Sequence, residues 1–420
     1  MRGLPGASLE AARMVAVHAV RWEDIRREPF RLLFPLGMLF GLVGVGHWLW
    51  YALGLNPSYS GFYHASIQIE AYLYCFIAGF LMTAIPRFAA SFYTTRGELA
   101  AVLGLLVVLF VSAGFGQWVW AGSCFAGLLL SLAIFIGRRF AARRVPEVQP
   151  PVEFVWIFIG LLHGLIGTAL LVLGQAGILP PLLLAVGRPM AQQGFVLGIV
   201  IGIGGFMGPR LMGHLENQAR WLRRREVSFH IGTGLLFFCS FWLEGAGAIR
   251  AAYLLRAAVA TLELGRMSRF YQSPRAKEEY IRMLRISIGM VLLGLWSAGL
   301  IPSFRVAAMH MTFLGGFSLM IFSMATMVVL SHAGEVGKLK QPLWVLRIAG
   351  IGVGLSLLSR IAADLFPAAF FQLLGAAAVF WMTAGLGWLI FAVPKVLRTI
   401  PAGELEKVHE QAKSKLLRPR

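Results

Sequence analysis

The feature that most constrains this chain is a series of apolar runs, each long enough to cross a lipid bilayer. The runs follow one another from residue 30 onward and are separated by short polar connections. An α-helix of about 20 apolar residues spans the hydrocarbon core of a membrane. The runs are continuous and do not alternate at a period of two, which excludes a transmembrane β-barrel. The sequence therefore predicts an all-α polytopic membrane protein.

We expect about twelve transmembrane helices in this chain. Hydrophobic residues make up 58% of the sequence and charged residues only 14%, a composition that excludes a soluble globular protein. The predicted spans are 30–53, 62–86, 97–115, 117–137, 152–174, 189–211, 227–243, 246–264, 281–301, 306–331, 342–366 and 368–393.

The basic residues indicate which side of the membrane is cytoplasmic. A net charge of +19 would suggest a nucleic-acid partner in a soluble chain. Here the arginines and lysines gather in alternate short connections, whereas connection 54–61 on the other side has no charge. Positive charge is typical of cytoplasmic loops and of contacts with anionic lipids. We therefore predict that both termini are cytoplasmic, that the lipid bilayer is the main partner and that nucleic acid is not bound.

Three regions follow from this assignment. Residues 1–29 are expected to form a basic amphipathic segment on the cytoplasmic membrane surface. Residues 30–393 form the twelve-helix transmembrane domain, and residues 394–420 form a basic cytoplasmic tail.

The second, sixth and tenth spans share a pattern that suggests internal repetition. Each is rich in glycine and ends in a polar corner at the cytoplasmic side: Pro86-Arg87, then 202–214, then 330–334. The three spans are four apart in order, so the pattern is typical of three repeats of a four-helix unit. Glycines at this density let helices, or a flat cofactor, approach the backbone closely.

Histidines in or near the spans are the first candidates for a metal or cofactor site. His47, His64 and His310 fall toward the outer surface, and His214 and His332 toward the cytoplasmic one. His310 and His332 are 22 positions apart, about 33 Å at the helical rise. Imidazoles on separate helices at similar depth can ligate haem iron or another metal. They can equally form hydrogen bonds between helices.

Charged residues inside the predicted spans are the second group of candidates. Glu70 lies six positions beyond His64 in the second span, and Arg256 lies well inside the eighth. Such charges face a partner or a wet cavity. We interpret Glu70 as part of a proton path and Arg256 as a clamp for a propionate or another anion, with buried structural pairing as the alternative. Arg360 and Asp364 are four apart and are expected to neutralise each other.

Two motifs give the chain a resemblance to a known family. One is His64 with the segment GFLMTAIPR at 79–87, and the other is His310 with Gly315 and the segment VVLSHAG at 328–334. In these segments the sequence resembles the NnrS family of bacterial polytopic inner-membrane proteins. Members have about twelve spans, are associated with the response to nitric oxide and are reported to contain haem and copper.

The resemblance implies several features of this chain. His64, His310 and His332 match the family's histidine positions, so haem b and copper are the implied cofactors. The chain departs from the pattern at Ser66 and Ile67, where many members have a second histidine and a glutamate. Glu335 stands where members usually have arginine. These departures concern the copper site more than the haem site.

Our first hypothesis is an inner-membrane haem protein that binds nitric oxide or a related small molecule and limits nitrosative stress. In one form of this hypothesis the protein is an enzyme that also reduces the bound molecule. His64, His310 and His47 would be the outer ligand candidates, with His332 and His214 as a second set. Reduction would need protons, for which we nominate Glu70, and an electron donor such as quinol.

Two other hypotheses remain open at this stage. Twelve spans with internal repeats and interrupted helices are also typical of secondary transporters. Arg256 and the Gln192-Gln193 pair would then bind a small anionic or polar solute near the membrane midplane. The third hypothesis is a membrane scaffold whose histidines only hold helices together.

Overall fold

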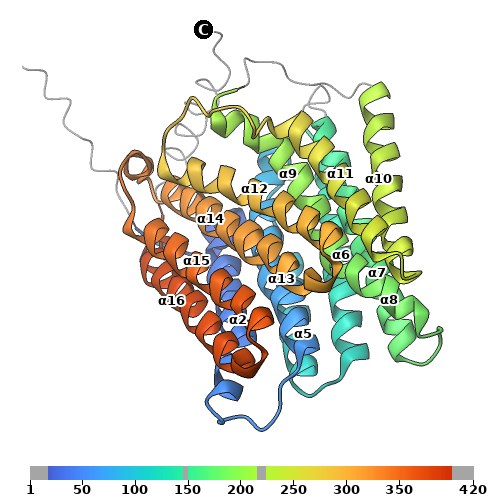
Figure 1. Cartoon of the computed structure of the whole chain (residues 1–420). Helices are drawn as coiled ribbons and strands as arrows, with labels where there is room; N and C mark the ends of the chain where they lie inside the picture. Colours follow the sequence, from blue (N-terminus) through green and yellow to red (C-terminus); the bar gives the residue numbers. More distant parts are fainter. Residues whose placement is uncertain (1–17, 145–149, 215–223, 400–420) are drawn as a thin grey trace, which may run out of the picture.

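The computed structural model describes residues 18–144, 150–214 and 224–399, and these residues are almost entirely helical (Figure 1). The first elements are β1 (His18–Ala19), α1 (Trp22–Arg27), α2 (Phe30–Ala52), α3 (Gly61–Ser66), η1 (Ile67–Leu73), α4 (Tyr74–Phe88), α5 (Arg96–Gly114) and α6 (Trp118–Ala141). The middle elements are η2 (Val152–Phe154), α7 (Val155–Gln175), α8 (Leu182–Pro189), η3 (Met190–Gly194), α9 (Phe195–Met212), α10 (Arg224–Gly245) and α11 (Ile249–Ser268). The last elements are α12 (Glu279–Leu300), η4 (Pro302–Phe304), α13 (Arg305–His310), η5 (Met311–Ser318), α14 (Leu319–His332), η6 (Val336–Lys340), α15 (Trp344–Leu365), η7 (Pro367–Ala369), α16 (Phe370–Val396) and β2 (Arg398–Thr399).

The helices confirm an all-α polytopic membrane protein. Within the described ranges, eleven helical rods are long and apolar enough to cross a membrane. The eighth predicted span, 246–264, is also a helix, α11, but charged residues such as Arg256 and Glu263 lower its apolar character. Both of these side chains are fully buried, so α11 depends on polar partners from neighbouring helices rather than on apolar surface alone.

Three of the rods are continuous in space although they are built of several elements. Rod A is Gly61–Phe88, rod B is Leu182–Met212 and rod C is Pro302–His332. Each contains a π-helical segment, and the three segments begin at residues 67, 190 and 311. Successive starts are about 120 residues apart, which is the length of one predicted four-helix repeat. A π-helical segment widens the turn and often occurs at functional sites.

The packing order repeats three times as well. In each repeat the first helix packs against the interrupted rod, and the third and fourth helices pack together. The fourth helix then packs against the first helix of the next repeat: α6 on α7, α11 on α12 and α16 on α2. The last of these contacts joins the two ends of the chain (Figure 1), so the three repeats close into a ring.

Glycines allow the closest helix contacts in this ring. A Cβ built on Gly198 of rod B would collide with the backbone of Gly160 on α7. Since only a residue without a side chain fits there, the α7–α9 crossing depends on glycine on both helices.

The strand pair lies where the two ends of the chain meet. β1 and β2 are antiparallel, with His18 opposite Thr399 and Ala19 opposite Arg398. The amphipathic helix expected over 1–29 lies partly outside the described residues. Its described part, from residue 18, forms β1 and the six-residue helix α1 rather than one continuous helix.

Candidate functional site

A cavity of about 410 Å³ lies between the three rods and helices α2, α15 and α16. Residues of all three π segments line it, so the repeats converge on one space. Aromatic and aliphatic side chains form most of the wall. The polar side chains in the lining are His64, Gln68, Tyr72, Arg188, Gln192, His310, Ser318, Ser356 and Arg360.

His64 on rod A and His310 on rod C both line this cavity. The Nδ1 of His64 lies 2.9 Å from the carbonyl oxygen of Gly44, and the Nδ1 of His310 lies 2.7 Å from that of Val306. A carbonyl oxygen only accepts, so Nδ1 must be the protonated nitrogen in both rings. The Nε2 lone pair of each ring is left without a hydrogen bond among the described residues. This is the tautomer that a metal-binding imidazole requires.

Helix α2 holds His64 in place through the backbone carbonyl groups of buried glycines. Gly44 accepts from His64, and Gly41 accepts from Gln68 Nε2 at 2.8 Å. A Cβ on Gly44 would lie 2.7 Å from Gln68 Nε2. The two glycines therefore bring α2 close enough for rod A side chains to reach its backbone.

The Tyr72 side chain forms part of the deeper wall of the cavity. Its ring packs edge-on against Trp381, with centroids 5.4 Å apart, and the residue is buried. The indole Nε1 of Trp381 donates to Ser318 Oγ at 3.2 Å. The Tyr72 hydroxyl lies beside the Ser318 hydroxyl but makes no hydrogen bond of good geometry within the part of the chain that the structure describes. Such a buried, unpaired donor is costly unless a ligand or water completes it.

Two arginines line the same cavity and differ in their partners. Arg360 Nη1 donates to Asp364 Oδ1 at 2.7 Å, which confirms the predicted pair on α15. The Arg188 guanidinium lies over the Phe62 ring, 5.1 Å from its centroid. No acidic side chain of residues 18–144, 150–214 or 224–399 pairs with Arg188. The cavity therefore retains one positive charge without a counter-ion.

These residues fit a haem better than a copper ion. Two unpartnered imidazole nitrogens, aromatic walls and arginines are the groups that bind a haem iron, its macrocycle and its carboxylates. By contrast, no cluster of three or more His, Cys, Asp or Glu side chains that could hold a metal ion occurs among the described residues. The methionines of rod C lie in the hydrophobic core or pack against it: Met309, Met320, Met324 and Met327.

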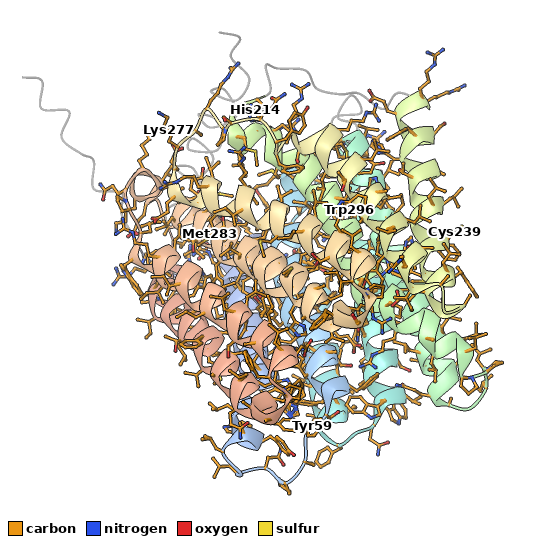
Figure 2. All side chains as sticks on the ribbon, in the orientation of Figure 1. Tyr59, His214, Cys239, Lys277, Met283 and Trp296 are labelled. Carbon is orange, nitrogen blue, oxygen red and sulfur yellow. The ribbon has the colours of Figure 1, made fainter. Side chains whose placement is uncertain are left out.

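The other predicted histidines do not line the cavity. His47 lies beside it, packs edge-on against Trp48 and accepts from the backbone N–H of Ser60 at 3.4 Å. His214 lies at the opposite end of the molecule from Tyr59 (Figure 2). Burial lowers the pKa of His214, and its Nε2 has no partner among the described residues. The structure thus brings together only His64 and His310 of the predicted set.

His332 ends rod C in a buried ion-pair cluster that the sequence did not predict. Its Nδ1 donates to Glu28 Oε1 at 2.7 Å. The same carboxylate accepts from Arg31 Nε at 2.6 Å and from Arg87 Nη2 at 2.9 Å. Arg31 Nη1 also donates to the carbonyl oxygen of Arg398 at 2.7 Å, so the cluster ties both chain ends together.

The charges around Glu28 control its ionisation. Burial acts to raise the pKa of the Glu28 carboxyl, but the charges of His332, Arg31 and Arg87 outweigh burial and hold this pKa well below its usual range. The sequence does contain a signal for this cluster, namely an acidic residue directly before the first apolar run. Because residues 1–29 were assigned to the membrane surface, burial of this residue was not predicted.

Arg256 lies in a separate buried cluster. Its guanidinium donates to Glu244 Oε2 at 2.8 Å, to Ser240 Oγ at 3.2 Å and to Gln193 Oε1. Glu263, on the same helix, instead accepts from His230 Nδ1 at 2.9 Å. Arg256 is therefore fully paired by its neighbours and lies away from the cavity.

Glu70 lies on the π segment of rod A but does not line the cavity. Its carboxyl group is buried beside the Ser66 hydroxyl. It is flanked along the chain by Ile69, which does line the cavity. A proton held by Glu70 would thus be near the cavity wall and not inside the cavity.

Comparison with known proteins gives one result that covers nearly the whole chain. Among curated proteins, none matches it. A family model described as NnrS protein matches residues 24–399, a range that includes all three rods and both histidines of the cavity. This multi-pass membrane protein therefore belongs to the NnrS family.

Proposed function

We propose that this protein binds haem b in the cavity between His64 and His310, and that nitric oxide or a related small molecule binds at that haem. The observation that carries the proposal is the presence in one cavity of two imidazoles from different repeats, neither of which uses its Nε2 in a hydrogen bond to a described residue. The likeness to the NnrS family supports nitric oxide as the gas.

A haem in this cavity would supply an iron that binds a diatomic ligand. The protein residues would do the rest. The carbonyls of Gly44 and Val306 keep the two imidazoles in the metal-binding tautomer. The Tyr72 hydroxyl, which has no other partner of good geometry among the described residues, would donate a hydrogen bond to a ligand in the cavity. The apolar wall would keep water from this bond.

If the protein also reduces nitric oxide, the reaction needs a source of protons and a source of electrons. We propose that Glu70 holds a proton beside the cavity, because its carboxyl group is buried close to the residues of the wall. A membrane quinol would be a suitable electron donor. With both termini cytoplasmic in a bacterial inner membrane, the cavity would lie in the outer half of the bilayer, where nitric oxide and quinol dissolve.

The transporter hypothesis receives less support from the geometry. Gln192 lines the cavity, but Gln193 donates to Tyr253 on the other side of rod B at 3.0 Å. The residues of the predicted solute site therefore do not lie together: Gln192 is at the cavity, whereas Gln193 and Arg256 belong to a separate buried cluster. In addition, the three repeats close into one ring, whereas many alternating-access carriers have two repeats that rock against each other.

Optical spectroscopy of the full-length protein tests the proposed function. Protein purified from haem-replete cells should show a Soret band that shifts when nitric oxide is added. His64→Gln and His310→Gln should each reduce the haem content. His163→Gln is the matched control, because His163 is a buried span histidine that does not line the cavity. A colourless wild-type protein, or equal haem loss in all three variants, would refute the proposal.

A further inference from the structure

We propose that Arg188 binds a carboxylate group of the ligand in the cavity. This inference rests on the proposed function, since the cavity is the same, but it concerns a different chemical group of the ligand.

The three interrupted rods place one basic side chain each at the cavity. His64, Arg188 and His310 lie one to three residues before the π segments of rods A, B and C. All three line the cavity. The repeat that lacks a histidine at this position therefore supplies a guanidinium instead, which binds anions and not metals.

The charge balance of the cavity points to an anionic ligand. Arg360 is neutralised by Asp364 at 2.7 Å. Arg188 has no such counter-ion anywhere in the described ranges. Its guanidinium instead lies over the Phe62 ring. Gln192 follows one helical turn later and lines the cavity too, so its amide N–H groups can assist Arg188.

A carboxylate suits this group of donors. The planar guanidinium forms two parallel hydrogen bonds with a carboxylate, and such charge-assisted bonds are stronger in a site of low dielectric. The carboxylate has two sources: a propionate of haem b, or a separate small carboxylate that enters the cavity. Both use the same chemistry at Arg188, and the experiment separates them.

The test compares haem with haem dimethyl ester, in which both propionates are blocked. Full-length apoprotein is titrated with each compound, and binding is followed by the Soret band. If Arg188 binds a propionate, the wild type should prefer haem by about 10- to 100-fold, the value of one charged hydrogen-bonded pair. Arg188→Gln should lose most of this preference, and Arg188→Lys should keep part of it.

Arg305→Gln is the matched control. Arg305 begins α13, lies 3.9 Å from Glu244 and does not line the cavity, so the variant removes an equal charge from outside the site. It should keep the wild-type preference. In a second arm, the thermal stability of wild type and Arg188→Gln is measured with and without acetate. Stabilisation of the wild type alone identifies a free carboxylate as the ligand of Arg188.

The outcomes separate the two proposals. Equal wild-type affinity for haem and its ester, together with no acetate effect, overturns the role of Arg188 and leaves the haem proposal intact. An unchanged preference in Arg188→Gln without an acetate effect overturns it too. If the wild type binds neither haem nor its ester, the proposed function fails, and only acetate stabilisation that depends on Arg188 would then support the inference.

Discussion

Replacing Glu28 by glutamine should destabilise the protein more than any single change on its charged surface. The carboxylate is 2% exposed and accepts hydrogen bonds from Arg31, Arg87 and His332. Removing one partner of a buried ion pair costs about 3–5 kcal/mol, because the remaining charge is left without compensation. An amide keeps the shape of the side chain, so the loss measures charge and not packing.

The corresponding shift in melting temperature follows from the size of the chain. An unfolding entropy of about 2.1 cal/mol/K per residue gives roughly 0.9 kcal/mol/K for 420 residues. The loss at Glu28 then lowers Tm by about 3–6 °C. Helices that stay formed in detergent reduce this entropy and make the shift larger. The assay is thermal unfolding of the purified protein in detergent, followed by intrinsic fluorescence.

Glu23→Gln is the control for this prediction. Glu23 lies five residues earlier and pairs with Arg26 and Arg96, but it is exposed, so its loss should change Tm little. A pH series gives a second test. Because the pKa of Glu28 is lowered in the folded state, its contribution is complete above about pH 4.5 and is lost as the pH falls below that value. Equal Tm values for both variants, or the same acid sensitivity in Glu28→Gln as in the wild type, would refute this account.

Three further predictions concern the cavity, the helix contacts and the membrane orientation. Tyr72→Phe should keep the Soret band but release nitric oxide about 5- to 10-fold faster in stopped-flow measurements, because one hydrogen bond is lost. Gly198→Ala should lower stability by about 1–3 kcal/mol through overpacking, whereas Gly104→Ala, with open space around its Cβ, should not; thermal unfolding compares the two. In intact cells a membrane-impermeant maleimide should label Ser58→Cys, and it should label Lys277→Cys only after permeabilisation, with the reverse result contradicting cytoplasmic termini.

The positions of the helices could be predicted from the sequence because apolar run length is a local property. Each of the twelve predicted spans coincides with a helix, and the glycine-rich second, sixth and tenth runs became rods A, B and C. The repeat was visible for the same reason, since the polar corners recur at a fixed spacing. The exception is α11, whose charged residues make it less apolar than the eleven rods that can cross a membrane.

The candidate site was predicted only in part. Depth along a helix grouped His64 with His310, and both line one cavity, because depth follows from the number of residues between a side chain and the end of its span. Depth does not define which way a side chain points. His47 has a similar predicted depth but accepts a backbone hydrogen bond beside the cavity, and Glu70 lies on the cavity's own π segment but does not line it.

The helical membrane fold and the pattern of three repeats can be predicted from the sequence, because hydrophobicity and spacing are properties of the residues in order. Which polar groups meet depends on the tertiary structure. Closure of the ring brings His64, Arg188 and His310 from three distant rods to one cavity, and it brings Glu28, just before α2, to His332 at the end of rod C. These pairings depend on how rigid helices pack together in space, and no local pattern encodes that arrangement.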